Sequence, residues 1–147
     1  MSKILIAEDN AVNRELLREL LEMRGHIVAE ACDGEEALRM IEQTQPDLLL
    51  LDIGMPLLDG FGVMRKIRES TQFASLPVVA VTAYAMQGDR EKILSSKFDG
   101  YLSKPVNARS LGEELDRLLS KRADHDISQN QSSGSQPRGE VRAARKS

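Results

Sequence analysis

Short apolar runs alternate along the chain with longer segments in which apolar residues recur every three or four positions. The runs are rich in leucine, isoleucine and valine, which favours strands, and the longer segments have the period of a helix. This alternation predicts an α/β fold with a parallel sheet, helices on both faces and right-handed crossovers. Strands are expected at residues 3–7, 27–31, 47–52, 77–82 and 100–103, and the helices that follow them are expected to begin near residues 11, 34, 60, 87 and 108.

The first two helices have recognisable ends in the sequence. Asn10 can cap the first helix and Gly25 can end it. Asp33 and Glu36 have the spacing of a capping box at the start of the second helix. The first helix is expected to carry an apolar face that consists of Val12, Leu16, Leu20 and Met23. Between the second and third helices, four consecutive leucines at residues 48–51 predict a central strand that helices cover on both sides.

The composition changes near the carboxyl end of the chain. The 147 residues suffice for one domain, and 41% of them are hydrophobic, which allows a packed interior. From residue 123 onward, however, serine, glutamine and basic residues predominate and large apolar residues are almost absent. Such a segment cannot bury enough apolar surface to offset the entropy of ordering it. We therefore expect one domain over residues 1–122 and a disordered tail over residues 123–147.

Composition and charge also limit the compartment and the partners. No apolar stretch approaches the roughly 18 residues of a membrane helix, and charged residues follow the first apolar run too soon for a signal peptide. The single cysteine, Cys32, excludes an internal disulfide, fits a reducing compartment and is expected in the core. The net charge of −3 does not favour nucleic acid as a partner. A cytoplasmic protein that binds neither nucleic acid nor membrane is expected.

Polar residues stand at the carboxyl ends of four of the five expected strands. In an open α/β sheet this edge is where ligands bind. If the first and third strands are neighbours, three carboxylates converge there, and because they repel one another, some must be protonated or a cation must neutralise them. Oxygen ligands with open coordination positions favour Mg²⁺. The residues are Glu8 and Asp9 after the first strand, Asp52 at the end of the third, Thr82 at the end of the fourth, and Lys104 and Pro105 after the fifth.

Each of these residues, taken singly, has a plain structural explanation. Asp9 could cap a helix, Asp52 could serve a turn, and a threonine such as Thr82 is common in strands. Lys104 could be a solvated surface cation. Their joint placement at corresponding strand ends is what favours a functional site.

Several motifs of the chain resemble those of the response-regulator receiver family of two-component signalling. The resemblance spans residues 3–122 and implies a doubly wound, flavodoxin-like sheet with strand order 2-1-3-4-5. Because no output domain is visible, a stand-alone receiver is expected. The motifs are Glu8-Asp9, the block Leu51-Asp52-Ile53-Gly54-Met55-Pro56 with Asp59-Gly60, the run Val81-Thr82-Ala83-Tyr84, and the run Asp99-Gly100-Tyr101-Leu102-Ser103-Lys104-Pro105.

The resemblance implies a phosphoacceptor switch rather than an enzyme, one that promotes its own phosphorylation and dephosphorylation. Asp52 would be the phosphoacceptor and Lys104 the cation that pairs first with its carboxylate and then with the phosphoryl group. Asp9, Asp52 and the backbone carbonyl of Gly54 would be ligands of Mg²⁺, for which Mn²⁺ could substitute, and Glu8 would act through water. The bond between Lys104 and Pro105 is commonly cis in the family.

The resemblance also implies a conformational response and a set of partners. The phosphoryl group would draw in the hydroxyl of Thr82 and the backbone amide near Ala83, and Tyr101 would then swing inward. A downstream protein would bind the face formed by the fourth helix, the fifth strand and the fifth helix. The phosphodonor would be a histidine kinase or a histidine phosphotransferase, and a shuttle within a phosphorelay is the main alternative.

Three residues depart from the common family pattern. Gly54 offers no side chain beside the phosphoryl group, and Tyr84 could instead crowd the path of a hydrolytic water. Lys97 occupies a position where relatives often have glycine, and a left-handed backbone there would cost about 1 kcal/mol.

Three rival functions share parts of this pattern. A flavodoxin-like cofactor binder would need a phosphate-binding loop, but the loop Glu8-Asp9-Asn10 would repel phosphate unless a metal intervened. A DNA-binding regulator would need an output module, and the tail is too short and polar for a helix-turn-helix. An interaction module that is never phosphorylated would not need the full set of carboxylates together with Lys104.

Overall fold

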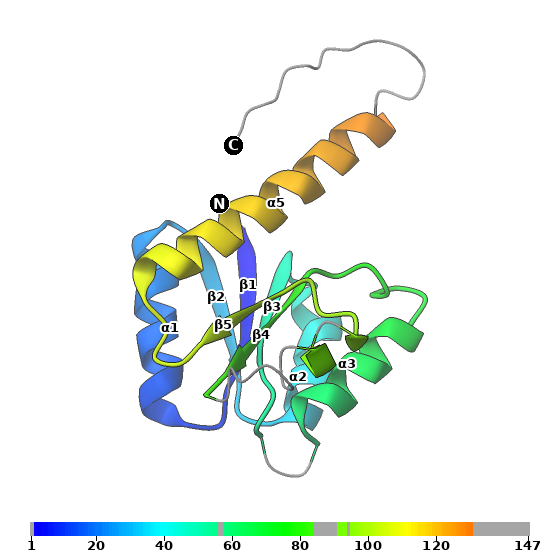
Figure 1. Cartoon of the computed structure of the whole chain (residues 1–147). Helices are drawn as coiled ribbons and strands as arrows, with labels where there is room; N and C mark the ends of the chain where they lie inside the picture. The colour runs from blue at the N-terminus through cyan, green and yellow to red at the C-terminus, as the bar shows by residue number, and fades with distance from the viewer. Residues whose placement is uncertain (1, 56–57, 84–90, 94, 131–147) are drawn as a thin grey trace. The chain divides into compact units, whose positions relative to one another are not determined.

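A computed structural model of the chain describes residues 2–55, 58–83, 91–93 and 95–130, with side chains described as far as Ser120 (Figure 1). The chain forms two compact units, residues 1–108 and residues 109 onward. The first unit holds all five strands, and the second holds the helix α5 (Ala108–Asn130) except its first residue.

The five strands form one parallel sheet in the order β2-β1-β3-β4-β5, so the expected α/β fold and strand order are confirmed. The chain starts in the middle of the sheet, adds β2 on one side and then builds outward on the other side. The order therefore reverses between β1 and β3, where a doubly wound sheet binds its ligands. The strands are β1 (Lys3–Ala7), β2 (Ile27–Ala31), β3 (Leu48–Asp52), β4 (Val78–Thr82) and β5 (Gly100–Ser103).

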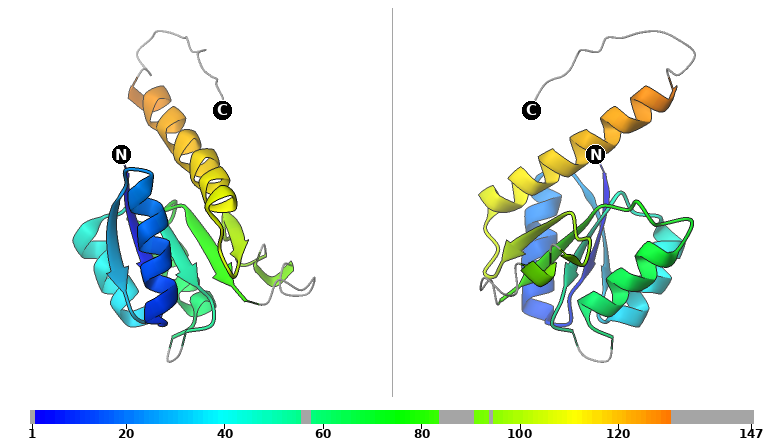
Figure 2. Two further views of the ribbon diagram at one scale, coloured as in Figure 1. Left: turned by 90° about the vertical axis from the view of Figure 1, so that its left-hand side faces the viewer. Right: turned by 45° about the vertical axis from the view of Figure 1, so that its right-hand side comes forward.

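Helices cover the sheet on both faces. Helix α1 (Ala11–Met23) packs on one face, and α2 (Gly34–Thr44) and α3 (Gly60–Glu69) lie together on the other (Figures 1 and 2). Helical residues are also present at 91–93 and 95, within the predicted fourth helix, whose expected start at residues 87–90 lies outside the described residues. Within the described part of the chain, no helix combines the length and the apolar character needed to cross a membrane.

The helix caps follow the sequence prediction. The side chain of Asn10 accepts a hydrogen bond from the backbone amide of Asn13, and Gly25 follows the helix with a φ of 87°. The carboxylate of Asp33 accepts from the amide of Glu36 at 2.8 Å. In return, the Glu36 carboxylate accepts from the amide of Cys32, one residue before the position that a capping box uses.

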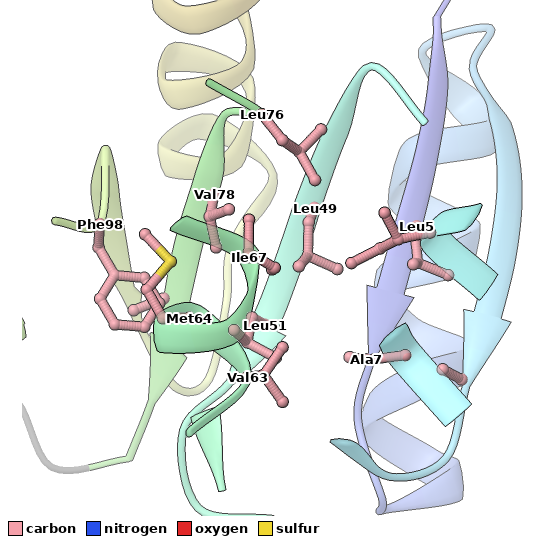
Figure 3. Packing of buried hydrophobic residues seen from close by; sticks show 14 of the residues in the cluster. Leu5, Ala7, Leu49, Leu51, Val63, Met64, Ile67, Leu76, Val78 and Phe98 are labelled. Atoms are coloured by element: carbon pink, nitrogen blue, oxygen red, sulfur yellow. The ribbon is translucent and has the colours of Figure 1, made fainter. Parts of the chain in front are cut away.

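The core between the sheet and the helices α2 and α3 uses alternate positions of each strand. Leu5, Leu49 and Val78 point to this side together with residues of α3, such as Met64 and Ile67 (Figure 3). The intervening strand residues are also buried, so all five residues of β3 and all five of β4 are buried. Burial on both faces explains the unbroken leucine run at residues 48–51.

The buried face of α1 differs from the prediction. Leu17 and Leu21 are its buried residues, whereas Val12 and Met23 are 75% and 83% exposed. The predicted apolar face was therefore wrong. The sequence places leucines at positions 16, 17, 20 and 21, which form two adjacent stripes one residue apart. Helical period alone cannot decide which stripe packs against the sheet, because both repeat every four residues.

The expectation for Cys32 was also wrong. Cys32 is exposed rather than in the core, because β2 ends at Ala31 and the next residues turn toward the cap of α2. Helix α5 extends to Asn130, and the boundary at residue 122 between a domain and a tail stays a prediction. No glycine or proline interrupts the chain between Ala108 and Asn130 except Gly112, so nothing in this stretch forces the helix to stop at Arg122. The disorder expected after residue 130 lies outside the described residues.

The backbone at Lys97 is left-handed, with a φ of 71°. This conformation was considered from the sequence because relatives often have glycine at the corresponding position. A lysine in this region costs about 1 kcal/mol relative to glycine. Arg68 on α3 holds the strained segment in place, since its guanidinium donates to the Lys97 carbonyl and to the Asp99 carboxylate, both at 2.9 Å. The same guanidinium also donates to the carbonyls of Ala74 and Leu76. One side chain thus joins α3 to the segments that lead into β4 and β5.

Candidate functional site

Three carboxylates meet at the carboxyl edge of the sheet. Glu8 and Asp9 follow β1, and Asp52 is the last residue of β3, which pairs directly with β1. One carboxylate oxygen of each residue lies within 4.8 Å of the other two. Glu8 is only 1% exposed and Asp52 5%, whereas Asp9 is open to solvent. The structure therefore brings together the acidic residues that the sequence nominated, in a cluster that opens on one side.

Lys104 brings a cation to this cluster from the loop after β5. Its Nζ lies 3.0 Å from Oε1 of Glu8 and 3.3 Å from Oδ2 of Asp52. The backbone amide of Lys104 donates to the carbonyl of Thr82 at 2.8 Å, so the residue is tied to the end of β4. The peptide bond between Lys104 and Pro105 is cis, as the family resemblance implied.

The remaining oxygens of the two buried carboxylates are held by backbone amides. Oδ1 of Asp52 accepts from the amide of Gly54 at 2.9 Å, and Oε2 of Glu8 accepts from the amide of Asn10 at 3.1 Å. Oε1 of Glu8 is buried and is paired with the ammonium of Lys104. The three clustered carboxylates, of which Asp9 is open to solvent, are an oxygen donor set that fits Mg²⁺.

The surroundings of the site raise the pKa of two of its groups, Glu8 and Lys104. Desolvation raises the pKa of Glu8, and the nearby Asp52 charge adds to this effect, while Lys104 and the Asn10 amide only partly offset it. Burial alone would lower the pKa of Lys104. Its hydrogen bond to Glu8 and the charges of Asp52 and Glu8 outweigh that effect and raise the pKa. Lys104 is therefore firmly charged at neutral pH.

The residues nominated for switching lie along the neighbouring strands. Thr82 ends β4 and is buried, and Ala83 follows it on the surface. Tyr101 lies in β5, half-buried, and packs against the core cluster. Pro105 follows Lys104 and lines a small hollow that also includes Glu8. Tyr84, expected to crowd the site, lies outside the described residues, and the roles of the other residues stay predictions.

Gly60 is a residue whose importance the motif did not explain. A Cβ added to it would lie 2.5 Å from the Cα of Ile53 and 3.0 Å from the carbonyl of Asp52, both of which are backbone atoms. At Gly54 an added Cβ would meet only Oδ1 of Asp52, at an ordinary 3.6 Å. The start of α3 therefore lies directly against the end of β3, and only glycine permits this approach.

Gly60→Ala is expected to destabilise the protein by about 1–3 kcal/mol, because the backbone of the strand end must shift to admit the methyl group. Denaturant unfolding, compared with the wild type, measures this change. Gly54→Ala is the matched control and should alter stability by less than about 1 kcal/mol. Equal unfolding midpoints for Gly60→Ala and the wild type would contradict the close approach.

Comparison with known families assigns the chain. The sequence model of the response regulator receiver domain matches residues 4–116. The chain belongs to the response-regulator receiver family. This membership agrees with the observed strand order and with the acidic cluster that the receiver domain carries at the edge between β1 and β3.

Curated relatives of this receiver domain include both stand-alone proteins and parts of larger ones. It is 38% identical over 116 residues to the polar-differentiation response regulator DivK of Brucella anthropi, which covers 79% of this chain and 94% of DivK. It is 43% identical over 108 residues to an uncharacterized 14.6 kDa protein of Leptolyngbya boryana, covering 74% and 82%. It is also 39% identical over 126 residues to the hybrid signal transduction histidine kinase I of Dictyostelium discoideum, covering 81% of this chain but 7% of that kinase.

Solved structures of receiver domains have the same fold. The receiver domain of a sensor histidine kinase from Pseudomonas aeruginosa superimposes with a TM-score of 0.76 at 36% identity, covering 81% of this chain and 98% of that one. That structure holds a magnesium ion coordinated in its active site cleft. The chemotaxis protein CheY4 of Vibrio cholerae superimposes with a TM-score of 0.75 at 27% identity, covering 80% and 98%.

Proposed function

We propose that this receiver domain accepts a phosphoryl group on Asp52 from a histidine kinase or a histidine phosphotransferase. One observation carries the proposal: a buried carboxylate, Asp52, is paired with the ammonium of Lys104 and clusters with two further carboxylates, those of Glu8 and Asp9. A structural ion pair would need only one carboxylate for each cation. The surplus negative charge, open to solvent at Asp9, favours a site for a cation and a phosphoryl group.

In the proposed reaction, a carboxylate oxygen of Asp52 attacks the phosphorus of a phosphohistidine. A bond from oxygen to phosphorus forms as the bond from phosphorus to the imidazole nitrogen breaks, and the imidazole takes up a proton. The Gly54 amide holds one oxygen of the nucleophile and thereby orients it. Lys104 is close enough to Asp52 to reach the oxygens of an incoming phosphoryl group, whose charge increases in the transition state. The product is an aspartyl phosphate.

Asp9, Asp52 and the carbonyl of Gly54 would hold Mg²⁺ or Mn²⁺, with Glu8 acting through a bound water. When bound, the cation would neutralise the clustered carboxylates and coordinate a phosphoryl oxygen. The acidic cluster of this chain and the magnesium in the Pseudomonas aeruginosa neighbour support this part of the proposal.

The phosphoryl group is proposed to act as a switch. Its oxygens would accept hydrogen bonds from the Thr82 hydroxyl and the Ala83 amide, and Tyr101 would then move inward beside β4. The change would bias two existing conformations of the face that includes the fourth helix, β5 and α5. A downstream protein would bind that face, and the domain would work in the cytoplasm as a phosphoacceptor rather than as an enzyme.

A phosphorelay intermediate is a second candidate. The similarity to a segment of a hybrid histidine kinase and to the receiver domain of a sensor histidine kinase favours it. In that role the aspartyl phosphate would pass its phosphoryl group to a histidine of a phosphotransferase. A rapid loss of label from the protein on addition of a histidine phosphotransferase would distinguish the relay from the switch.

The proposed function is tested by withdrawing the metal. Wild-type protein incubated with a radiolabelled small phosphodonor and Mg²⁺ should acquire an acid-stable, hydroxylamine-sensitive label, and excess chelator should abolish it. Mg²⁺ at about 100 times its dissociation constant should also stabilise the fold by about 2.7 kcal/mol, seen as a higher unfolding temperature. Labelling at an unchanged rate in chelator would refute the metal-assisted reaction.

A further inference from the structure

Arg14, which the motifs did not include, connects the acidic loop to the edge strand β2. It lies in the second turn of α1, and its guanidinium contacts two separate segments. Nη1 donates to the backbone carbonyl of Glu8 at 2.8 Å, and Nε donates to the carboxylate of Glu30 in β2 at 3.1 Å. Arg18 contacts the other oxygen of the Glu30 carboxylate. Glu30 is thus held between two arginines, of which only Arg14 is described as reaching the acidic loop.

The contact with Glu8 fixes the peptide that leads into Asp9. The amide of Glu8 donates to the carbonyl of Ala31 at 3.0 Å, and its side chain accepts from the amide of Asn10. Arg14 holds the remaining polar group of the residue, its carbonyl. Because a peptide unit is planar, holding this carbonyl also sets the direction in which the chain enters Asp9. Asp9 itself is exposed and needs such support from its neighbours.

We infer that Arg14, held in place by Glu30, is a positioning residue that directs Asp9 toward the acidic cluster. The inference rests on the proposed function in so far as Asp9 is a metal ligand. A planar guanidinium suits the task because its two edges donate in fixed, different directions. A lysine has no such fork, so it cannot hold the Glu8 carbonyl and the Glu30 carboxylate in the same relative orientation.

Charge alone leads to the opposite expectation, which makes the inference testable. Removing a positive charge near a cation site should strengthen the binding of Mg²⁺. Loss of a positioning residue should instead weaken it, as happens when groups that orient metal ligands are removed. The sign of the change in affinity therefore separates the two effects.

The experiment compares Arg14→Ala, Arg14→Lys and the control Arg18→Ala in the full chain. Arg18→Ala removes the same charge and also a contact to Glu30, but not the contact to Glu8. Arg14→Ala should weaken Mg²⁺ binding by about 10-fold, with Arg14→Lys in between, as measured by calorimetry. Arg18→Ala should change it by less than about 3-fold.

A second readout needs neither metal nor phosphodonor. The amide of Asn10, which donates to the Glu8 side chain, should exchange its hydrogen about 10-fold faster in metal-free Arg14→Ala than in the wild type. Exchange in the middle of β3 should not change, which would show that the fold is intact. This measurement decides the positioning role even if the wild type were to take up no label.

Two results would overturn the inference. One is Mg²⁺ affinity in Arg14→Ala that equals or exceeds that of the wild type, which would mean that the arginine acts by charge alone. The other is Asn10 exchange that is equal in Arg14→Ala and Arg18→Ala. Failure of the wild type to bind Mg²⁺ or to be labelled would instead count against the proposed function.

Discussion

Asp52→Asn is expected to lower phosphoryl uptake by at least about three orders of magnitude, because the amide that replaces the carboxylate is a poor nucleophile. Asparagine keeps the shape of the side chain, and its oxygen can still accept the hydrogen bond from the Gly54 amide. The loss should therefore reflect chemistry rather than altered packing. Incorporation of label from a small phosphodonor, followed over time in the presence of Mg²⁺, measures the effect.

Asp47→Asn is the matched control for this prediction. Asp47 immediately precedes the same strand, β3, at its opposite end, and its carboxylate accepts from the amide of Lys3 at 2.8 Å. The same substitution there should leave labelling within about 2-fold of the wild type, because surface changes away from a site have small effects. Uptake by Asp52→Asn at the wild-type rate would show that another residue is the acceptor.

Lys104→Met should lower the rate of labelling by about 10²–10³-fold while leaving Mg²⁺ binding intact or stronger. Methionine keeps an unbranched side chain but provides no charge for the transferring phosphoryl group. The same loss removes a cation that repels Mg²⁺ from the neighbouring carboxylates. Labelling rates and calorimetric titration with Mg²⁺ separate the two effects.

The same substitution should also cost stability in the metal-free protein. The pKa of Lys104 is raised in the fold, so its stabilising charge is fully present below the unfolded value and is lost only as pH rises through the higher, folded value. At neutral pH, Lys104→Met should therefore destabilise the protein by roughly 1–2 kcal/mol. This loss is smaller than for a fully buried ion pair, because the Lys104 side chain is one-fifth exposed and solvent screens its charge. Lys66→Met, on the exposed side of α3, is the control. Unchanged labelling in Lys104→Met would remove this lysine from the proposed reaction.

The two predictions distinguish the roles of the paired charges. Asp52 is needed for the new covalent bond, whereas Lys104 is needed to stabilise charge that develops on the phosphoryl oxygens. A variant that loses labelling but keeps Mg²⁺ affinity therefore indicates a defect in the chemical step. A variant with weakened Mg²⁺ affinity, as expected for Arg14→Ala, indicates a defect in the metal site.

The sequence determined the sheet and the chemistry at its edge. Apolar runs placed the strands to within one residue, because burial of β1, β3 and β4 on both faces leaves few positions for polar residues except at the ends of these strands. Glu8, Asp52 and Lys104 could be found for that reason, since a charged residue directly after a buried strand must lie at the edge of the sheet. That they lie close together followed once β1 and β3 were taken as neighbours.

Only the tertiary structure decided which of two similar surfaces is buried and which distant groups touch. Two leucine stripes on α1 have the same period, and packing against the sheet selected Leu17 and Leu21. Arg14 reaches Glu8 and Glu30 because β2 lies beside β1 and α1 packs against both strands, and no local pattern records which side chains meet there. Glycine is required at position 60 because the backbone of Ile53 lies directly against it, and the spacing of residues in the sequence does not reveal this contact. Periodicity reports the direction of a side chain relative to its own element, whereas these contacts depend on how separate elements are placed.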